Sequence, residues 1–404
     1  MTDTIIVIGA GQAGGWAAKT LRSEGFAGKI VFIGDEQHLP YERPPLSKAV
    51  LAGEAAPETT HLFKPGALEE LRLEWRRGER AAAIDRDAKR VVLSHGELIG
   101  YDKLILCTGG RARWPSVAGA DLPGVFALRT IEDSLAIGRA LDEAKRLVVV
   151  GGGWIGLEVA ATARKKRVAV TVVEARPRLC ERTVPRQVSE YLLALHRKNG
   201  TQAILGCGLV GFARDPGRAL SVQLDDGRAL EADMAVVGVG LVANDELGRA
   251  AGLACDNGVL VDEQCRTSDP DIFAAGDIAI APNRWIGQRI RLESWQNAQD
   301  QAIVAAKVAL GHDAHYDPLP WFWSDQYDMN LQIYGLPAPS QRAVVRGDMA
   351  SGSFVVFYLE GDCVKAAVAA NATRELRFAR RFIEQGKSVR DADLADPRAV
   401  LAKL

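Results

Sequence analysis

The stretch TIIVIGAGQAG, residues 4–14, decides the fold of this chain. Its apolar run predicts a buried strand, and the glycines that follow predict a tight turn and the start of a helix. Gly9 supplies the turn, Gly11 lets the backbone approach a phosphate, and Gly14 lets the helix pack closely on the strand. Because the first N–H groups of a helix face an anion, the stretch predicts a site for the pyrophosphate of a dinucleotide.

The same pattern returns in RLVVVGGGWIG, residues 146–156. An apolar strand again leads into glycines with the spacing G-x-G-x-x-G, here Gly151, Gly153 and Gly156. One such pattern is a weak signal on its own. Two of them in one chain predict two Rossmann-like dinucleotide-binding domains.

Composition limits the kinds of partner. The chain has 404 residues, 48% of them apolar and 25% charged, which is enough to bury more than one core. Its formal net charge is −1 and the lysines and arginines are spread along the sequence, which argues against binding to nucleic acid or to a membrane surface. No leader-like segment precedes the first strand and no apolar run is long enough to span a bilayer, so we expect a cytoplasmic protein.

The cysteines are dispersed and include no C-x-x-C pair. That spacing fits neither a disulfide framework nor a zinc or iron–sulfur site, so we predict no bound metal and reduced, mostly buried thiols. The six residues are Cys107, Cys180, Cys207, Cys255, Cys265 and Cys363.

Acidic residues close the strand that follows each glycine pattern. Asp35 comes directly after the run Lys29–Gly34, and Glu174 ends the run Val168–Val173. In dinucleotide folds an acidic side chain at this place holds ribose hydroxyls, and it repels a 2′-phosphate. Glu174 therefore favours NADH over NADPH. Nearby arginines weaken that preference, since they could face either water or the pyrophosphate: Arg176, Arg178 and Arg182.

From Leu319 onward the composition changes to a Trp-rich stretch, three strand-like segments and helical patterns around 374–385 and 392–403, which predicts a small α+β domain. The predicted fold class is therefore α/β, with two Rossmann-like domains and this C-terminal domain. We expect an FAD-binding domain over residues 1–110 and 243–318, an NADH-binding domain over 111–242, and the α+β domain over 319–404.

The two glycine patterns, the strand end Thr108-Gly109-Gly110 and the stretch 267–277 carry a wider family resemblance. Four motifs, one of which extends the second glycine pattern, carry a narrower one, and the resemblance covers nearly the whole chain. The chain resembles the glutathione-reductase-like flavoproteins with two dinucleotide-binding domains and, more narrowly, the FAD-dependent ferredoxin reductases that serve aromatic-ring dioxygenases and bacterial cytochrome P450 systems. In that family the first glycine pattern holds FAD and the second holds the nicotinamide coenzyme. The motifs are PYERPPLSK at 40–48, GGGWIGLE at 151–158, RLESWQNA at 291–298 and WFWSDQ at 321–326.

The resemblance implies site residues at matching positions. For FAD it implies Gly9, Gly11, Gly14, Asp35, Arg43, Lys48, Ala81, Thr108, Gly109, Arg129, Asp277 and Trp295. For NADH it implies Gly151, Gly153, Ile155, Gly156, Glu158, Glu174 and Gly240, with Glu293 near the nicotinamide. Cys107, Trp154 and Trp295 stand where the family often has smaller side chains, which bears on fine cofactor geometry and not on the class.

The resemblance also implies a reaction. NADH gives a hydride to the flavin, and electrons leave singly to two molecules of a [2Fe–2S] ferredoxin that feeds a terminal oxygenase. We expect Lys48, paired with Glu158, to stabilise negative charge on the reduced flavin, and Trp323 to lie on the acceptor side. Residues 1–106 contain no cysteine, so no thiol relay takes part.

Three other functions stay open from the sequence. A rubredoxin reductase or an NADH oxidase would use the same domains. A non-enzymatic flavoprotein of the apoptosis-inducing-factor type would need a basic nucleic-acid-binding face and a long C-terminal insertion, and neither is visible.

Overall fold

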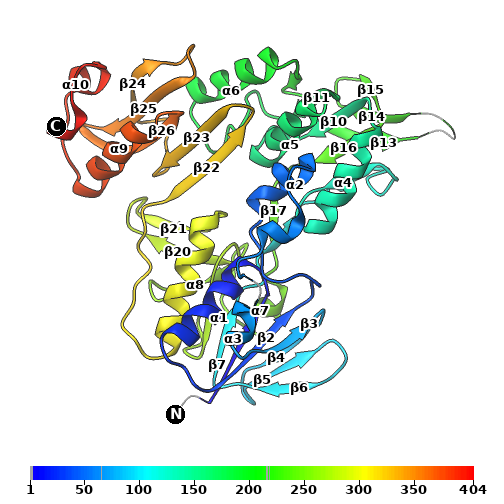
Figure 1. Ribbon diagram of the computed structural model, residues 1–404, viewed down its shortest axis with the longest axis vertical. Helices are drawn as coiled ribbons and strands as arrows, with labels where there is room; N and C mark the ends of the chain where they lie inside the picture. Colours follow the sequence, from blue (N-terminus) through cyan, green and yellow to red (C-terminus); the bar gives the residue numbers. More distant parts are fainter. Residues whose placement is uncertain (1–2, 65, 215–216, 218) are drawn as a thin grey trace. The chain divides into compact units, whose positions relative to one another are not determined.

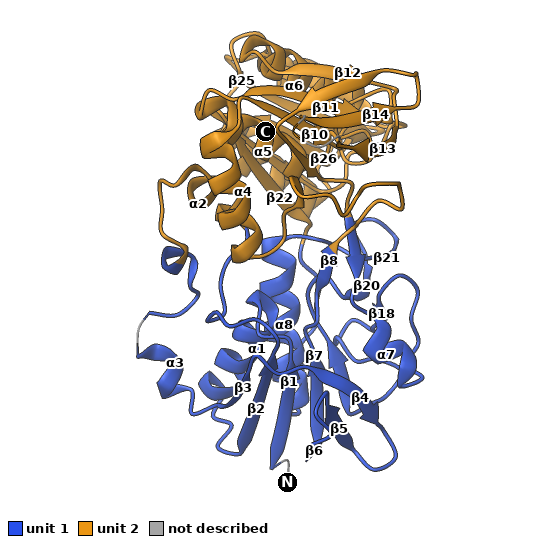
Figure 2. Ribbon diagram, turned by 90° about the vertical axis from the view of Figure 1, so that its right-hand side faces the viewer, with its two compact units in different colours: residues 1–43, 58–111, 241–318 blue, residues 44–57, 112–240, 319–404 orange. Residues whose placement is uncertain are grey.

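The computed structural model describes residues 3–64, 66–214, 217 and 219–404. The chain divides into two compact units (Figure 2). Unit 1 contains residues 1–43, 58–111 and 241–318, and unit 2 contains residues 44–57, 112–240 and 319–404. Each unit is therefore built from segments that lie far apart in the sequence.

Unit 1 is organised around a parallel sheet with strand order β19-β7-β1-β2-β3. Ile6 of β1 pairs with Val31 of β2 on one side and with Leu104 of β7 on the other. β1 is central and buried on both faces, as its unbroken apolar run predicts. The strands are β1 (Thr4–Ile8), β2 (Lys29–Gly34), β3 (Glu74–Arg77), β7 (Lys103–Leu106) and β19 (Ile272–Ala274).

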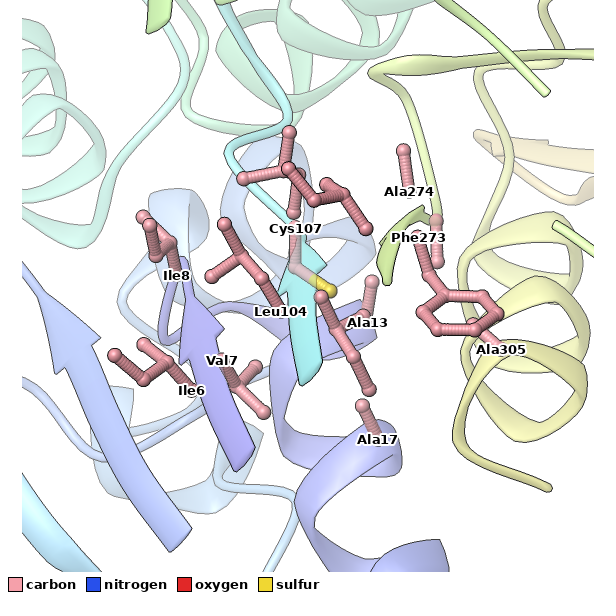
Figure 3. Close-up of a cluster of buried hydrophobic side chains, with 14 of the residues drawn as sticks. Ile6, Val7, Ile8, Ala13, Ala17, Leu104, Cys107, Phe273, Ala274 and Ala305 are labelled. Carbon is pink, nitrogen blue, oxygen red and sulfur yellow. The ribbon is translucent and has the colours of Figure 1, made fainter. Parts of the chain in front are cut away.

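Two helices, α1 (Gln12–Ser23) and α8 (Trp295–Ala309), lie side by side in unit 1 (Figure 1). Small residues at the contact, such as Ala13, Ala17 and Ala305, let them pack closely on the sheet, and Figure 3 shows Ala305 beside the ring of Phe273. The core of unit 1 thus lies directly beneath the first glycine pattern.

The remaining elements of unit 1 are two small three-stranded sheets, short helices and a two-stranded ladder of β8 with β17. They are η2 (Pro57–Thr60), α3 (Ala67–Glu70), β4 (Ala81–Asp85), β5 (Arg90–Leu93), β6 (Leu98–Gly100), β8 (Gly110–Ala112), β17 (Leu241–Ala243), α7 (Glu246–Ala250), β18 (Val259–Leu260), β20 (Ala279–Asn283) and β21 (Gln288–Ile290), with the first residue of η2 and the last residue of β8 assigned to unit 2.

Unit 2 repeats the plan with a parallel sheet of order β12-β11-β10-β16-β9. β10 is central, and Val149 pairs with Val172 of β11 and with Val236 of β16. A three-stranded antiparallel sheet, β13-β14-β15, adjoins it. The elements are β9 (Val125–Ala127), α4 (Ile131–Glu143), β10 (Arg146–Val150), α5 (Trp154–Lys165), β11 (Ala169–Glu174), α6 (Arg186–Lys198), β12 (Gln202–Leu205), β13 (Leu209–Ala213), β14 (Leu220–Leu224), β15 (Ala229–Ala232) and β16 (Met234–Val237).

The segment 44–57 belongs to unit 2, whereas the sequence division placed it in the FAD-binding domain. It forms η1 (Pro44–Ser47) and α2 (Ala49–Ala52). Ser134 Oγ of α4 donates a hydrogen bond to the Leu46 carbonyl at 2.7 Å, and Thr162 of α5 donates to the Ser47 carbonyl at 2.8 Å. These long-range contacts, which local sequence does not encode, hold the segment in unit 2.

The C-terminal part of unit 2 is an antiparallel sheet of order β22-β23-β26-β25-β24 with α9 packed against it (Figure 1). The strands β22 and β26 were not predicted. The helix predicted over 392–403 is wrong, because it is broken at Pro397, which lies between α10 and η3. The elements are β22 (Trp321–Gln326), β23 (Met329–Tyr334), β24 (Arg342–Asp348), β25 (Ser353–Glu360), β26 (Cys363–Ala370), α9 (Thr373–Gln385), α10 (Asp391–Ala395) and η3 (Leu401–Lys403).

Among the described helices, we find none that combines the length and the apolar character needed to cross a membrane.

Candidate cofactor and catalytic sites

The first glycine pattern has the geometry of a phosphate-binding loop. Gly9 has φ of +107°, and a Cβ there would lie 2.1 Å from the Cys107 carbonyl oxygen. A Cβ on Gly14 would lie 1.9 Å from the Gly9 carbonyl oxygen. A Cβ on Gly11 would meet just one atom of the described residues, Nη2 of Arg43 at 4.0 Å. Two glycines are thus required by packing, while the middle one borders open space at the start of α1, as a bound pyrophosphate needs.

Cys107 takes part through its backbone and not through its sulfur. Its carbonyl oxygen abuts Gly9, and burial raises the pKa of its thiol to about 12. A thiol that stays protonated is a poor nucleophile. The expectation of mostly buried thiols is confirmed, since four of the six cysteines are buried and none is in a disulfide.

The two acidic residues after β2 have different surroundings. Glu36 is bound on both carboxylate oxygens, by Nη2 of Arg43 at 2.7 Å and by the Tyr41 hydroxyl at 2.5 Å. Asp35 is exposed and follows Gly34, which packs against Ala10 of the glycine loop. The exposed carboxylate of Asp35 thus stands at the end of β2, whereas Glu36 holds Arg43, whose Nη2 lies 4.0 Å from the Cβ position of Gly11.

Asp277 lies where α1 and α8 begin. The preceding Gly276 has φ of +82°, and a Cβ there would lie 3.1 Å from Cβ of Ala13 in the first turn of α1. The Gly276 N–H donates to Gln301 Oε1 of α8 at 2.9 Å. Across the same helix starts, the Gln12 side chain donates to the Trp295 carbonyl oxygen at 3.0 Å. The fold thus brings Asp277 and Trp295 to the first glycine loop.

The turn after β7 is held by Asn244, which the sequence did not single out. Asn244 Nδ2 donates to the Thr108 carbonyl at 2.9 Å, and Thr108 Oγ1 donates to the Asn244 carbonyl at 2.9 Å. The Asn244 N–H donates to the Gly109 carbonyl. No sequence motif marked this residue, because its role depends on a partner 136 positions away. Ala81 begins β4, also within unit 1.

The second glycine pattern repeats the geometry of the first in unit 2. Gly151 has φ of +111°, with its Cβ position 2.4 Å from the Gly238 carbonyl oxygen. A Cβ on Gly156 would lie 2.1 Å from the Gly151 carbonyl oxygen. A Cβ on Gly153 would meet just one atom of the described chain, the Gly238 oxygen at 4.0 Å. Ile155, in the first turn of α5, is 45% exposed, as an apolar side chain beside a cofactor site would be.

Glu174 is tied to the second glycine loop. Its Oε2 accepts a hydrogen bond from the Gly152 N–H at 2.6 Å, and its Oε1 accepts one from the Arg176 N–H at 2.8 Å. Two of the nearby arginines are bound to protein groups, since Arg178 donates to Ser189 Oγ and Arg176 forms an ion pair with Glu181. The third, Arg182, has Nη2 3.6 Å from the Cβ position of Gly240.

The predicted pair of Lys48 and Glu158 is confirmed as a contact. Lys48 Nζ lies 2.7 Å from Glu158 Oε2. The Ser47 hydroxyl donates to the same oxygen, and Ser324 Oγ donates to Glu158 Oε1 at 2.7 Å. Glu158 is 4% exposed, so its charge is balanced by these three donors and not by water.

The predicted FAD residues do not all lie in one unit. Lys48 and Arg129 are in unit 2, whereas the other predicted FAD residues are in unit 1. Glu293, predicted near the nicotinamide, is in unit 1 and pairs with Arg291 Nη1 at 2.8 Å. The Arg129 N–H donates to Asp133 of the α4 capping box.

The WFWSDQ motif forms strand β22, and two of its tryptophans stack. Trp321 and Trp323 have ring centroids 5.0 Å apart and planes 22° apart. The Trp321 ring centroid is also 6.3 Å from that of Tyr334, over which the Arg380 guanidinium lies at 5.7 Å. The rings of Trp323, Trp321 and Tyr334 therefore form an aromatic row that ends at the positive charge of Arg380.

One group of side chains has metal-ligand atoms within reach of each other. The ligand atoms of Glu79, His95 and Glu97 lie within 4.8 Å of one another in unit 1. Arg76 sits among them, 2.7 Å from Glu97 and 4.0 Å from Glu79. Because the Arg76 guanidinium already balances the negative charge of Glu79 and Glu97, these side chains fit an ion-pair cluster.

Comparison with known proteins agrees with this geometry. Residues 3–302, which include both glycine loops, match the family model described as pyridine nucleotide-disulphide oxidoreductase. The chain belongs to this family. Residues 321–404 of this oxidoreductase match a second model, described as reductase C-terminal. The predicted family, the α/β fold class and the cofactors FAD and NADH are thereby confirmed.

The oxidoreductase is similar over its length to named reductases. It is 43% identical to rhodocoxin reductase of Rhodococcus erythropolis, covering 94% of this chain and 89% of that protein. It is 42% identical to the anthranilate 1,2-dioxygenase system ferredoxin–NAD(+) reductase component of Burkholderia cepacia, and the match covers 98% of this chain and 97% of that protein. The structure matches the crystal structure of the covalent putidaredoxin reductase–putidaredoxin complex with a TM-score of 0.95 and 39% identity, covering 99% and 97%.

Proposed function

We propose that this chain is an NADH:ferredoxin oxidoreductase that uses FAD and supplies electrons to a dioxygenase or a cytochrome P450. The observation that carries the proposal is the pair of glycine loops with the same open middle position, at Gly11 and Gly153, joined to a C-terminal domain of the reductase type. The full-length similarity to ferredoxin reductases supports the same function.

FAD would be held chiefly by unit 1. The open space at Gly11 would take the pyrophosphate, Arg43 would neutralise it, and Asp35 would bind the ribose. Burial lowers the pKa of Arg43, yet neighbouring Tyr41 and Glu36 raise it above its ordinary value, so the guanidinium stays charged. The other proposed contacts are Gly9, Gly14, Lys48, Ala81, Thr108, Gly109, Arg129, Asp277 and Trp295. When bound, FAD accepts a hydride from NADH and passes electrons on singly.

NADH would be held by unit 2. Gly153 would border its pyrophosphate and the exposed Ile155 would pack against it. Glu174 would accept hydrogen bonds from a ribose and exclude a 2′-phosphate, which favours NADH. The other proposed contacts are Gly151, Gly156, Glu158 and Gly240, with Glu293 near the nicotinamide.

Lys48 would hold a positive charge toward the reduced flavin. Glu158 fixes the direction of the Lys48 ammonium at 2.7 Å, so the charge needs no reorganisation during the reaction. Trp323 would lie on the side where electrons leave. The partner is proposed to be a [2Fe–2S] ferredoxin, bound transiently and by charge, with the oxygenase served indirectly, and the site of action is proposed to be the cytoplasm.

One comparison of rates tests this function. The purified chain, loaded with FAD, is supplied with NADH and with a panel of [2Fe–2S] ferredoxins, a rubredoxin, or oxygen alone. We expect a ferredoxin to be reduced at least about tenfold faster than the other two acceptors. Faster reduction of rubredoxin or of oxygen would replace the proposal with a rubredoxin reductase or an NADH oxidase.

A further inference from the structure

Strand β22 presents two different faces. Because side chains alternate along a strand, Trp321 and Trp323 share one face, and Ser324 and Gln326 share the opposite face. Ser324 is 0% exposed and Gln326 is 1% exposed. A buried hydroxyl and a buried amide in one strand need partners, and those partners come from α5 and α6.

The partners form a continuous row of hydrogen bonds within unit 2. Ser324 Oγ donates to Glu158 Oε1 at 2.7 Å, and Gln326 Nε2 donates to Ser324 Oγ at 3.0 Å. Gln326 Oε1 lies 2.8 Å from Nε2 of His196, which is 1% exposed. The Tyr327 hydroxyl lies 3.3 Å from His196 Nδ1. The row therefore links helix α6 to the carboxylate that holds Lys48.

The donors in this row all point toward Glu158. The carboxylate can only accept, so the Ser324 proton is directed to it, and Ser324 must then accept from the Gln326 amide. That leaves the Gln326 oxygen to accept the proton on His196 Nε2, and His196 Nδ1 to accept from Tyr327. A row with one consistent direction is polarised, and each bond strengthens the next.

We propose that Ser324, Gln326 and His196 are positioning residues that fix Glu158, and through it Lys48, in the orientation that the reductase needs. The row is not a proton path, because the Gln326 amide separates the protons of His196 from those of Ser324. It acts by fixing one rotamer of a buried carboxylate. The proposal rests on the proposed function, since it gives the second half of the WFWSDQ motif a task in the same reaction.

The first test measures the position of Lys48 without using activity. The FAD-loaded protein is treated with trace acetic anhydride, and acetylation of Lys48 is followed by peptide mass spectrometry. Lys166 is the internal control, because it is also in unit 2, is 19% exposed against 21% for Lys48, and has its own ion pair with Asp142 at 2.6 Å. In Ser324→Ala we expect Lys48 to be acetylated about threefold to tenfold faster, the factor that one lost hydrogen bond corresponds to, with Lys166 unchanged.

Two further variants show whether the effect travels along the row. Gln326→Met keeps the volume but removes both of its hydrogen bonds, so we expect a smaller rise in Lys48 acetylation than in Ser324→Ala. Tyr358→Phe is the matched control. It removes a buried hydroxyl from the same sheet, and this hydroxyl has no hydrogen-bond partner among the described residues. It should leave Lys48 acetylation unchanged.

The reductive half-reaction gives the second readout. Flavin bleaching by NADH in stopped flow should slow by about threefold to tenfold in Ser324→Ala at saturating NADH. Equal acetylation of Lys48 in wild type and Ser324→Ala, or an equal effect of Tyr358→Phe, would overturn the positioning role. If instead the wild type reduces no ferredoxin while Lys48 responds as expected, the proposed function fails and the positioning stands.

Discussion

The Gly152 N–H donates a hydrogen bond of 2.6 Å to Glu174 Oε2, which ties the second glycine loop to the end of the neighbouring strand. Glu174 therefore has two tasks. One oxygen orients the loop that would receive the pyrophosphate, and the carboxylate as a whole carries the negative charge that would select the coenzyme. These tasks can be separated, because an amide keeps a hydrogen-bond acceptor but loses the charge.

Replacement of Glu174 should therefore change coenzyme choice in two graded ways. We expect Glu174→Gln to reduce the preference for NADH over NADPH by about 1–3 kcal/mol in kcat/KM, and to lower the midpoint of thermal unfolding less than Glu174→Ala does, because its one amide oxygen can still accept from the Gly152 N–H. Glu174→Ala should reduce the preference for NADH by a similar amount. It should also lower the midpoint of thermal unfolding, because the Gly152 N–H loses its acceptor. Glu231→Ala, which removes an exposed carboxylate of unit 2, is the control. A wild type that already uses both coenzymes equally would contradict this role.

Gly11 and Gly153 both border open space, and replacing each of them should remove the binding of a different cofactor. Gly11 and Gly153 have φ of −85° and −83°, so a larger residue fits the backbone and its side chain would fill the space left for a phosphate. We expect Gly11→Val to be isolated as a folded, colourless protein without FAD. Gly153→Val should remain yellow and lose affinity for NADH. Flavin absorbance and NADH titration of the two purified variants check this, and loss of FAD from Gly153→Val would show that the loops are assigned wrongly.

His196 should make stability depend on pH. Burial lowers its pKa below the ordinary value of 6.5, although the hydrogen bond to Gln326 opposes the shift. The unfolded chain then binds the proton more readily, so stability falls as pH drops below about 6.5 toward the folded-state pKa. We expect the free energy of unfolding in urea to fall more steeply between about pH 7 and pH 5 in wild type than in His196→Gln. Parallel curves for the two proteins would contradict a buried, neutral His196.

The glycine loops could be predicted because their requirements are local. Gly9 and Gly14 are demanded by backbone contacts that a Cβ would break, and such demands appear in the sequence as spacing. The pair of Lys48 and Glu158 was predicted from the family resemblance, and the structure confirms the contact. The placement of residues 44–57 in unit 2 was not predicted, because it depends on hydrogen bonds from two helices much later in the chain.

Strand β26 was missed for a similar reason. Its sequence, CVKAAVAA, is rich in alanine, which favours helix over strand. It forms a strand because β23 and β25 pair with it on both sides, so tertiary pairing outweighs local preference. The row from Ser324 to His196 was likewise invisible, since its last link joins residues 130 positions apart. The family resemblance marked the WFWSDQ motif as important, but the sequence does not show which of its side chains contact which helix.

The last prediction concerns Trp323 and the release of electrons. Trp323 stacks on Trp321, and the aromatic row continues through Tyr334 to the positive charge of Arg380. A ferredoxin is acidic, so we expect its reduction to weaken with salt over a screening length of about 8–10 Å. Trp323→Ala should slow ferredoxin reduction and leave flavin bleaching by NADH largely intact, whereas Trp285→Ala, a half-buried tryptophan of β-hairpin β20–β21 in unit 1, should slow neither. If Trp323 only fills space, its replacement will lower thermal stability and slow both half-reactions together, and the acceptor-side role must then be abandoned.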